Sequence, residues 1–305
     1  MENKIVLEVS GLSLSFKMYD RGLRQKQVQV ISNLNVKVRE GEILAVAGSS
    51  GSGKSLLAHA ILGILPSNAT IKGDISYMGE PLSESRIKKL RGREIALVPQ
   101  SVEYLDPLMK VGRQVSKDKA AVRTVFERYR LDKRVEKMFP FQLSGGMMRR
   151  VLCATAVVSG AKLIIADEPT PGMSAELAKR AMKHFRDLAD EGAAVMLITH
   201  DLDLAIGYAD KVAVFYAGTT VETALSTDFS EESKLRHPYT KALWRAMPEN
   251  GFRPTPGAQP QPDISLRGCL FAKRCDMKEK DDRCLSGAIE PRELRCGEVC
   301  CLYAS

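Results

Sequence analysis

The sequence predicts an α/β fold built around a mostly parallel sheet, and three observations support this prediction. Short apolar runs recur that are typical of strands buried on both faces: EILAVAG, EIALVPQ, KLIIADE, AVMLITH and KVAVFYAG. Helical patterns alternate with these runs from about Ile43 to Tyr216. A glycine-rich segment, Gly48–Ser55, lies between the first run and a helix, which is where such sheets bind phosphate.

Length and composition bound the class of protein. The chain has 305 residues, 44% of them hydrophobic and 27% charged, as expected for one large domain plus an appendage. The segment MENKIVLEVS lacks signal-peptide features, and no apolar run approaches the ~20 residues that span a bilayer, so we expect a cytoplasmic protein with reduced thiols. Lys and Arg are interspersed with Asp and Glu, so the net charge of +8 favours a solvated basic surface over a polyanion site.

The segment GSSGSGKS matches the phosphate-loop (P-loop) pattern G-x-x-x-x-G-K-S. Its members are Gly48, Ser49, Ser50, Gly51, Ser52, Gly53, Lys54 and Ser55. Glycines let the backbone N–H groups turn toward phosphate oxygens, Lys54 supplies a cation, and the Ser55 hydroxyl is a ligand for Mg²⁺. The helical pattern KSLLAHAILGIL follows and stops before Pro66, whereas an accidental glycine-rich turn would lack this strand and helix. We therefore expect the chain to bind a nucleoside triphosphate.

Two acids end the apolar strand in KLIIADEP. Asp167 is the candidate for a second Mg²⁺ anchor beside the P-loop. Glu168 follows it and is the candidate general base that polarises the attacking water. A pair of solvated strand-end carboxylates is the alternative, but the apolar strand favours the carboxyl edge of the sheet, where ligands bind in α/β folds.

Two further strands end in polar residues. His200 ends VMLITH, and a neutral imidazole there could bond the γ-phosphate or the attacking water, although a lone histidine is more often structural. Gln100 ends IALVPQ, and its amide could ligate Mg²⁺ or orient that water. We expect these strand ends to meet at one phosphate.

The segment QLSGGMMRR contains a second donor-rich turn at a helix start. Ser144, Gly145 and Gly146 could cradle phosphate through the Ser144 hydroxyl and their backbone N–H groups. One phosphate does not need two cradles in one chain. We therefore expect this turn to close over the nucleotide of a different subunit.

These motifs in this order resemble those of the ATP-binding-cassette (ABC) ATPases, from about Ile5 to Thr227. The resemblance implies a P-loop ABC-type nucleotide-binding domain at residues 1–227, with an N-terminal antiparallel β part and a helical subdomain at about 101–160. It implies ATP and Mg²⁺ as ligands, with Mg²⁺ held through Ser55, Gln100 and Asp167. It also implies that Phe16 stacks on adenine and that Gln100 lies in a loop coupled to a partner. Two cassettes, identical or merely homologous, would sandwich two ATP molecules.

A finer resemblance is to the dipeptide, oligopeptide and nickel importer branch of that family. LDPLMKVGRQV after Gln100, LSGGM with Met147, and HPYTKAL carry it. It implies a transporter-type extension at residues 228–305, membrane permease subunits, an extracytoplasmic binding protein and attachment to the cytoplasmic side of the membrane. His237, in HPYT, is interpreted as a structural turn residue rather than a ligand.

The chain departs from the branch in three respects. Ser174 stands where the branch usually carries an Asp in the loop that crosses the dimer interface. Met148-Arg149 follow the signature where Arg-Gln is usual, and the span from Gln100 to Ser144 is short. The first departure leaves open a regulatory cassette that hydrolyses ATP poorly, although Glu168 favours hydrolysis.

The tail after the proline-rich linker GFRPTPGAQPQPD holds six of the seven cysteines, and the seventh, Cys153, is expected in the core. In a reducing compartment clustered thiols favour metal ligands over disulfides. Four tail cysteines match in order the tail of many branch members: Cys269, Cys275, Cys284 and Cys301. Cys296 and Cys300 remain alternatives to Cys301. Wide spacing and the resemblance favour a structural [4Fe–4S] cluster, with zinc second and unliganded cysteines as the remaining alternative.

We thus expect an ATPase subunit that powers an importer for peptides or nickel-type substrates. A soluble ABC ATPase acting on DNA or ribosomes is the alternative that the basic charge permits. The single cassette, HPYT and the cysteine tail argue against it.

Overall fold

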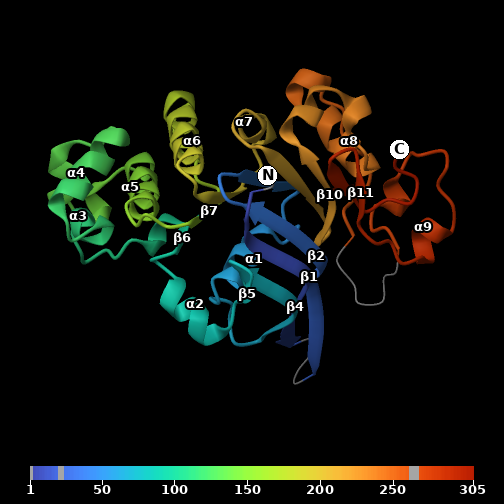
Figure 1. The fold of residues 1–305 in the computed structure, drawn as a ribbon, viewed down its shortest axis with the longest axis horizontal. Helices are drawn as coiled ribbons and strands as arrows, with labels where there is room; N and C mark the ends of the chain where they lie inside the picture. Colours follow the sequence, from blue (N-terminus) through green and yellow to red (C-terminus); the bar gives the residue numbers. More distant parts are fainter. Residues whose placement is uncertain (1–2, 20–23, 261–267) are drawn as a thin grey trace.

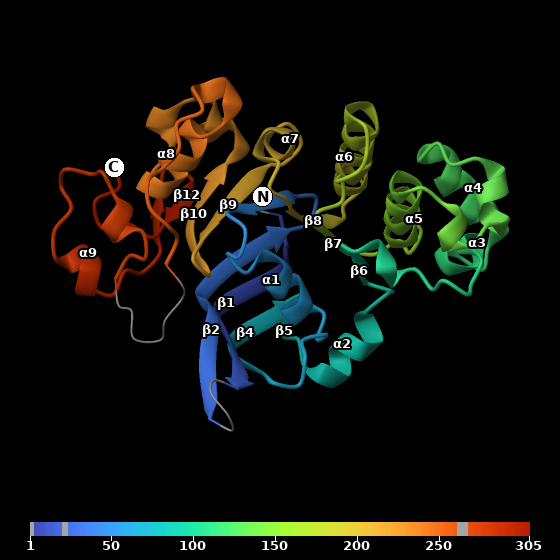
Figure 2. The same cartoon turned by 180° about the vertical axis from the view of Figure 1, so that it is seen from behind.

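The computed structural model describes residues 3–19, 24–260 and 268–305. Figures 1 and 2 show two sheets in the middle of the molecule, a group of helices at one end and the C-terminal extension at the other. Within the described residues, no helix combines the length and the apolar character that crossing a membrane requires.

The larger sheet is mixed, in the order β11-β12-β10-β9-β3-β8-β7-β6. Its central strands pair in parallel, which confirms the predicted parallel core. They are β3 (Ile43–Gly48), β6 (Ile95–Val98), β7 (Leu163–Asp167), β8 (Ala194–Ile198) and β9 (Lys211–Tyr216). β10 (Thr219–Leu225), β11 (Arg292–Leu294) and β12 (Gly297–Val299) extend it in antiparallel fashion. The cysteine tail therefore adds two strands to the main sheet, which its sequence did not predict.

The smaller sheet is antiparallel, as expected for the N-terminal β part, in the order β2-β1-β4-β5. Its strands are β1 (Ile5–Tyr19), β2 (Gln25–Arg39), β4 (Ala69–Tyr77) and β5 (Glu80–Pro81). β1 is a central strand of this sheet, since it pairs with both β2 and β4.

The larger sheet separates two hydrophobic cores. Along β3, Leu44 and Val46 belong to one core, while Ile43, Ala45 and Ala47 belong to the other. This alternation follows from the two-residue period of a strand. The first core also takes in α1 (Lys54–Ile61) and the smaller sheet, so the helix after the P-loop is enclosed between two sheets.

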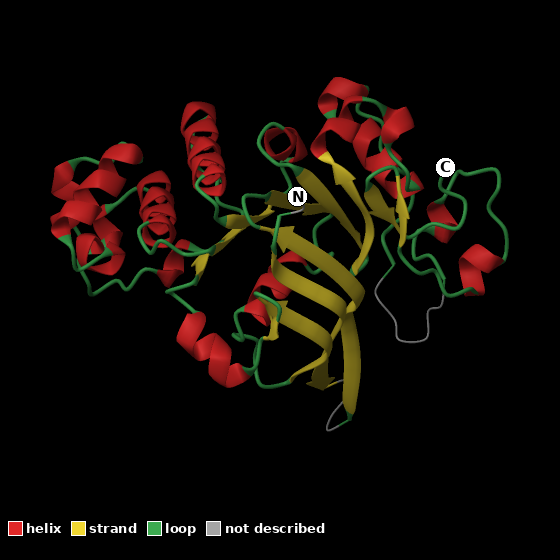
Figure 3. Ribbon diagram, in the orientation of Figure 1, coloured by secondary structure: helices red, strands yellow, loops and turns green. Residues whose placement is uncertain are grey.

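The remaining helices are red in Figure 3; those between residues 111 and 245 contribute to the second core, whereas Leu90, in the earliest of them, packs against the first core. They are α2 (Glu84–Leu90), α3 (Val111–Val115), α4 (Lys119–Arg128), α5 (Gly145–Val157), α6 (Ala175–Asp190), α7 (Leu202–Ile206), α8 (Pro238–Arg245) and α9 (Arg283–Ser286). Single 3₁₀ turns are η1 (Val102–Tyr104), η2 (Lys133–Lys137), η3 (Pro140–Gln142), η4 (Ser226–Ser230), η5 (Glu232–Lys234), η6 (Pro248–Asn250) and η7 (Ala272–Arg274). α3, α4 and α5 form the group of helices at one end, within the span expected for a helical subdomain.

The proline-rich segment has no helix or strand from Gly251 to Pro260, as expected of a linker. The end of that predicted linker, residues 261–263, lies outside the described residues. We call residues 254–260 the strap, because they run from α8 back toward the P-loop.

Candidate nucleotide site and cysteine pocket

The P-loop begins where β3 ends and turns too tightly for a side chain at Gly48. Gly48 has φ 153°, and a Cβ there would lie 2.2 Å from the Phe215 carbonyl oxygen. Gly53 has φ 93°, and a Cβ there would lie 2.8 Å from Cγ1 of Ile31. Glycine at these two positions is therefore a steric requirement of the loop.

Lys54 lies inside this loop rather than in solvent. Its Nζ donates to the carbonyl oxygens of Gly48 and Ser49, at 2.8 and 3.0 Å. Burial lowers the pKa of Lys54, while the nearby Glu168 and Asp167 raise it. A cation held this way against backbone carbonyls is available to a polyphosphate that enters the loop.

Two of the three predicted Mg²⁺ ligands lie together. Ser55 Oγ donates to Asp167 Oδ1 at 3.2 Å, joining the start of α1 to the end of β7. Burial raises the pKa of Asp167, and the bond from Ser55 opposes that shift. A hydroxyl beside a partly desolvated carboxylate is a donor set that suits a hard cation.

Glu168 and His200 also meet, from the ends of β7 and β8. The His200 Nδ1 and Glu168 Oε2 atoms are 2.8 Å apart, although no donor among the described residues is aligned with Oε2 as a hydrogen bond. The Glu168 side chain is 9% exposed and His200 70%. The backbone of Glu168 has φ 48°, a conformation that is costly for a residue with a side chain and that is fixed by a bond from its N–H to the Ile198 carbonyl.

Gln100 and Phe16 are placed near this edge but not joined to it. Gln100 follows β6, beyond β7 in the sheet, and its exposed side chain makes no hydrogen bond to Ser55 or Asp167 among the described contacts. Phe16 is half-buried on β1, where it pairs with Val28 and Ala69. The roles of both side chains remain predictions.

The signature turn is open to solvent. Ser144 is the N-cap of α5, its hydroxyl accepts from the Met147 N–H at 3.3 Å, and the residue is exposed together with Gly145. Figure 1 shows α5 well separated from α1 and the P-loop. Within this chain the two candidate phosphate cradles therefore do not face one another.

Ser174 has a local structural role. It is the N-cap of α6, and its hydroxyl accepts from the Leu177 N–H at 3.5 Å. Asp and Ser are both preferred N-caps, so the departure from the usual Asp preserves the start of this helix.

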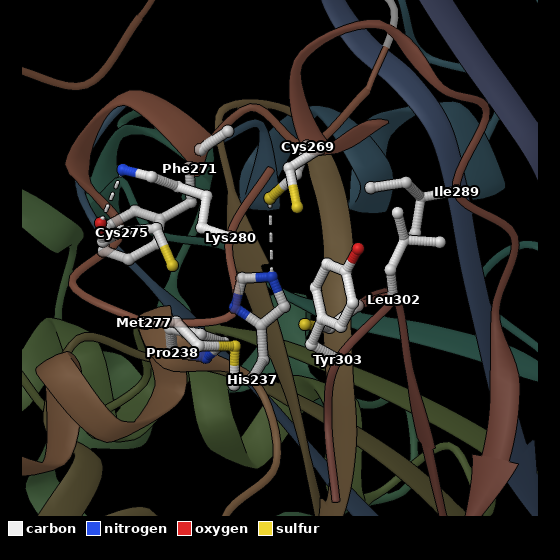
Figure 4. A pocket seen from close by; sticks show the side chains of 13 residues that line it. His237, Pro238, Cys269, Phe271, Cys275, Met277, Lys280, Ile289, Leu302 and Tyr303 are labelled. Carbon is white, nitrogen blue, oxygen red and sulfur yellow. Dashed lines mark hydrogen bonds between the residues drawn. The ribbon is translucent and has the colours of Figure 1, made fainter. Parts of the chain in front are cut away.

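Four of the tail cysteines line one pocket (Figure 4). They are Cys269, Cys275, Cys284 and Cys301. Burial raises the pKa of Cys269 to about 12, and the other three thiols add to the shift. No three potential ligands in the described part of the chain are gathered closely enough to form a ready-made metal site.

The alternatives to Cys301 lie elsewhere. Cys296 is exposed, and Cys300 lines a different cleft beside Glu222 and Pro291. Cys153 is buried in the second core, as expected, and its burial raises the pKa of that thiol to about 12.

His237 borders the cysteine pocket and caps a helix. Its Nδ1 accepts from the Tyr239 N–H at 3.0 Å at the start of α8, and its Nε2 lies 3.7 Å from Cys269 Sγ. Burial lowers the pKa of His237 to about 3. The interpretation of His237 as a structural residue agrees with this geometry.

Sequence reasoning missed two contacts to the P-loop. Gln259 of the strap accepts a hydrogen bond from Ser49, and the Tyr239 hydroxyl of α8 lies beside Ser49, which lowers the pKa of Tyr239 while burial raises it. HPYT singled out the segment of Tyr239 without assigning it a role, and nothing in the strap sequence pointed to Gln259.

Comparisons with known proteins agree with these motifs. The chain matches the family described as "ABC transporter" at residues 31–171 and "Oligopeptide/dipeptide transporter, C-terminal region" at residues 221–284. It is 35% identical to "Oligopeptide transport ATP-binding protein OppD" of Bacillus subtilis (strain 168), over 91% of this chain and 83% of that protein. It is 34% identical to "Putative peptide import ATP-binding protein BAB2_1052" of Brucella abortus (strain 2308), over 88% of this chain and 87% of that protein.

The fold has solved neighbours as well. One is the dimeric post-hydrolysis state of the ATP-binding cassette MJ0796 bound to ADP and Pi, with a TM-score of 0.64 and 22% identity. The likeness covers 72% of this chain and 98% of that one, so it extends over the cassette and shows its fold.

Proposed function

The chain belongs to the ABC transporter ATPases that carry an oligopeptide/dipeptide-type C-terminal region, and from that premise we propose that it powers a peptide importer. The observation that supports this most directly is the cluster at the carboxyl edge of the sheet, where Lys54, Ser55, Asp167, Glu168 and His200 lie together. Relatives named for oligopeptide transport and peptide import favour peptides, with nickel-type substrates of the same branch as the second choice.

The cluster assigns a separate task to each side chain. Backbone N–H groups of the P-loop and Lys54 bind the phosphates, and Ser55 and Asp167 would hold Mg²⁺, with Gln100 completing the set. Mg²⁺ would neutralise charge on the phosphate oxygens. Glu168 accepts the proton of the attacking water, and His200 orients that carboxylate and contacts the γ-phosphate. Phosphoryl transfer depends mainly on such positioning.

A second cassette completes the site in this proposal. The signature turn is exposed at Ser144 and Gly145 and distant from the P-loop of its own chain, so it is free to cover the nucleotide of a partner. Phe16 stacks on the adenine of the nucleotide bound in its own chain.

The helical end of the molecule offers a surface for the permease. Four apolar side chains there are exposed: Tyr104 at 56%, Leu108 at 86%, Met109 at 41% and Phe141 at 75%. Exposed apolar groups gathered near one end are typical of a protein-binding surface. Docking there would attach the chain peripherally to the cytoplasmic side of a membrane.

We assign the cysteine pocket to a structural [4Fe–4S] cluster, with zinc as the second choice. The four thiols come from segments that are otherwise short of a core and line a single pocket, where the pKa of Cys269 is raised by burial and further by the other three thiols. A cluster there would tie α9 and the chain end to the rest of the extension.

Iron and sulfide analysis after anaerobic purification tests this assignment. Cys301→Ser should lose most of the iron, whereas the neighbouring Cys300→Ser should keep it. Zinc in place of iron would favour the second choice, and a folded, metal-free wild-type tail would rule the cluster out.

Gentle solubilisation of membranes tests the importer proposal. An N-terminally tagged chain should co-purify with two polytopic membrane proteins and a cassette partner, and those proteins would determine the substrate. Recovery only in the soluble fraction with nucleic acid or ribosomes would instead support the alternative.

A further inference from the structure

Two side chains of the C-terminal extension reach the first turn of the P-loop. The Ser49 hydroxyl donates to Oε1 of Gln259 in the strap. The Tyr239 hydroxyl, on α8, lies beside Ser49: burial raises the pKa of Tyr239, and the side chain and backbone of Ser49 lower it. The P-loop is thus held by residues about 190 to 210 positions further along the chain.

Tyr239 is itself firmly placed. It is 6% exposed and packs against Tyr216 and Phe271, with ring centroids 4.4 and 5.4 Å away. Tyr216 is the last residue of β9, which pairs with β3, the strand that leads into the P-loop. Packing against Tyr216 therefore fixes the position of Tyr239 relative to Ser49. Aromatic clusters of this kind stabilise their members beyond simple burial.

The strap is held by Arg274, from η7. The Arg274 guanidinium donates to the carbonyl oxygens of Thr255 and Pro256, both at 2.9 Å, and to the Tyr216 hydroxyl at 3.1 Å. It also lies over the Phe271 ring. Gln259 therefore belongs to an anchored segment when it bonds Ser49.

The only other side chain of the described structure that bonds the Gly48–Ser49 turn is Lys54, through the two carbonyl oxygens. A polyphosphate entering the loop competes for that ammonium, because a charge-assisted bond to phosphate is the stronger one. The turn then depends on contacts that do not involve the nucleotide, the hydrogen bond of Ser49 to Gln259 and its contact with Tyr239.

We propose that Tyr239 and Gln259 are positioning residues of the nucleotide site, holding Ser49 so that the P-loop keeps its phosphate-binding shape when Lys54 turns to the nucleotide. This inference rests on the proposed binding of ATP. It makes the C-terminal extension part of the nucleotide site and couples the affinity for ATP to the folding of that extension.

A double-mutant cycle on the full chain tests the proposal, with trinitrophenyl-ATP and Mg²⁺ as the probe. Ser49→Ala and Gln259→Met should each raise the Kd about threefold to tenfold, since each removes one hydrogen bond. The double variant should bind no more weakly than the weaker single variant, because both changes break the same contact. Ser49→Thr retains the hydroxyl and should restore the affinity to within about twofold.

Two tyrosines of the extension provide a matched pair. Tyr239→Phe should weaken binding about threefold to tenfold, whereas Tyr303→Phe, whose hydroxyl donates to Asp281, should leave it unchanged. A purely structural role of Tyr239 would lower the unfolding midpoint without any coupling to Ser49. In the assembled transporter the variants should raise KM with kcat changed by less than about twofold.

The outcomes separate the two proposals. A wild-type chain that binds the probe while all variants bind equally well would overturn the positioning role alone, and so would independent, multiplicative effects in the cycle. A wild-type chain that binds no nucleotide would overturn the proposed function as well.

Discussion

At the nucleotide edge, reactive side chains lie at the ends of strands that are buried and otherwise apolar, whereas in the C-terminal extension buried charged side chains hold the structure together. Every residue of β7 and β8 is buried; Asp167 is the last residue of β7, Glu168 follows it, and His200 lies just beyond β8. In the extension the largest fully buried side chain is Arg236, which is 1% exposed.

Arg236 shows how the extension is assembled. Its guanidinium bonds Glu222 at 3.1 Å, Asp228 at 2.9 Å and the carbonyl oxygens of Leu294 and Arg295. It thereby joins β10 to η4 and to the hairpin of β11 and β12. A region with too few apolar contacts to form its own core relies on such polar anchors. The charged side chains at the nucleotide edge of the cassette are thus positioned for ATP binding and hydrolysis, whereas the buried charged side chains of the extension stabilise its packing against the sheet.

Neutralising Glu168 should abolish most ATP hydrolysis without destabilising the C-terminal extension. Glu168→Gln should lower ATP turnover by about a hundredfold or more, because a general base contributes roughly 10²–10⁴ in rate. Binding of Mg-ATP should persist, since Lys54, Ser55 and Asp167 are unchanged. Turnover of the assembled transporter and nucleotide titration measure the two effects, with the exposed Glu176→Gln as control. Turnover near wild type would mean that another group is the base.

Replacing Arg236 should instead destabilise the C-terminal extension. Arg236→Met leaves Glu222 buried and without its counter-charge, so the extension should lose about 3–5 kcal/mol of unfolding free energy. Trp244, the single tryptophan, lies on α8 and makes its fluorescence in a urea titration a local probe.

The exposed pair of Arg130 and Glu176 provides the control for this change. Their side chains are 53% and 69% exposed, and Arg130→Met should cost at most about 1 kcal/mol. Equal losses from Arg130→Met and Arg236→Met would contradict a special role for the buried anchor.

Lowering the pH should destabilise the C-terminal extension through His237. Burial lowers the pKa of His237 to about 3, so below the ordinary pKa of about 6.5 the unfolded chain binds a proton that the folded chain does not. Its contribution is therefore complete above pH 6.5 and falls as the pH drops from 6.5 toward 3, by about 2 kcal/mol at pH 5. Urea titrations followed by Trp244 fluorescence at pH 7 and pH 5 measure this loss.

His237→Asn is the matched variant for the acid effect. Asn keeps an oxygen that can cap α8 but does not titrate in this range. Its stability should fall less between pH 7 and pH 5 than that of the wild type, and identical slopes would assign the acid sensitivity to other groups.

Much of the nucleotide edge was predictable from sequence because its determinants are contiguous. A buried strand, a glycine-rich turn and a helix follow one another from Ile43 to Ile61, and each later acid or histidine lies at or just beyond the end of its strand. Parallel pairing then brings the carboxyl ends to one edge, so Ser55 and Asp167 meet although they are far apart in sequence. The meeting of Glu168 and His200 follows from the same rule.

The extension was far less predictable, because its contacts join segments with no local pattern. Six tail cysteines offered three alternatives for the fourth position of the set, and only the path of the chain around β12 brings Cys301 to the pocket while Cys300 faces another cleft. The strands β11 and β12 are three residues each, too short for alternation to reveal them.

The sequence by itself thus determined the fold class, the family and the residues at the nucleotide edge, because short-range spacing encodes strands, turns and helix starts. Only the tertiary structure decided that Cys301 lines the pocket, that Arg236 anchors the tail to the sheet, and that Gln259 bonds Ser49. The physical reason is that these contacts depend on where distant segments pack, and packing is set by the whole core rather than by neighbouring residues.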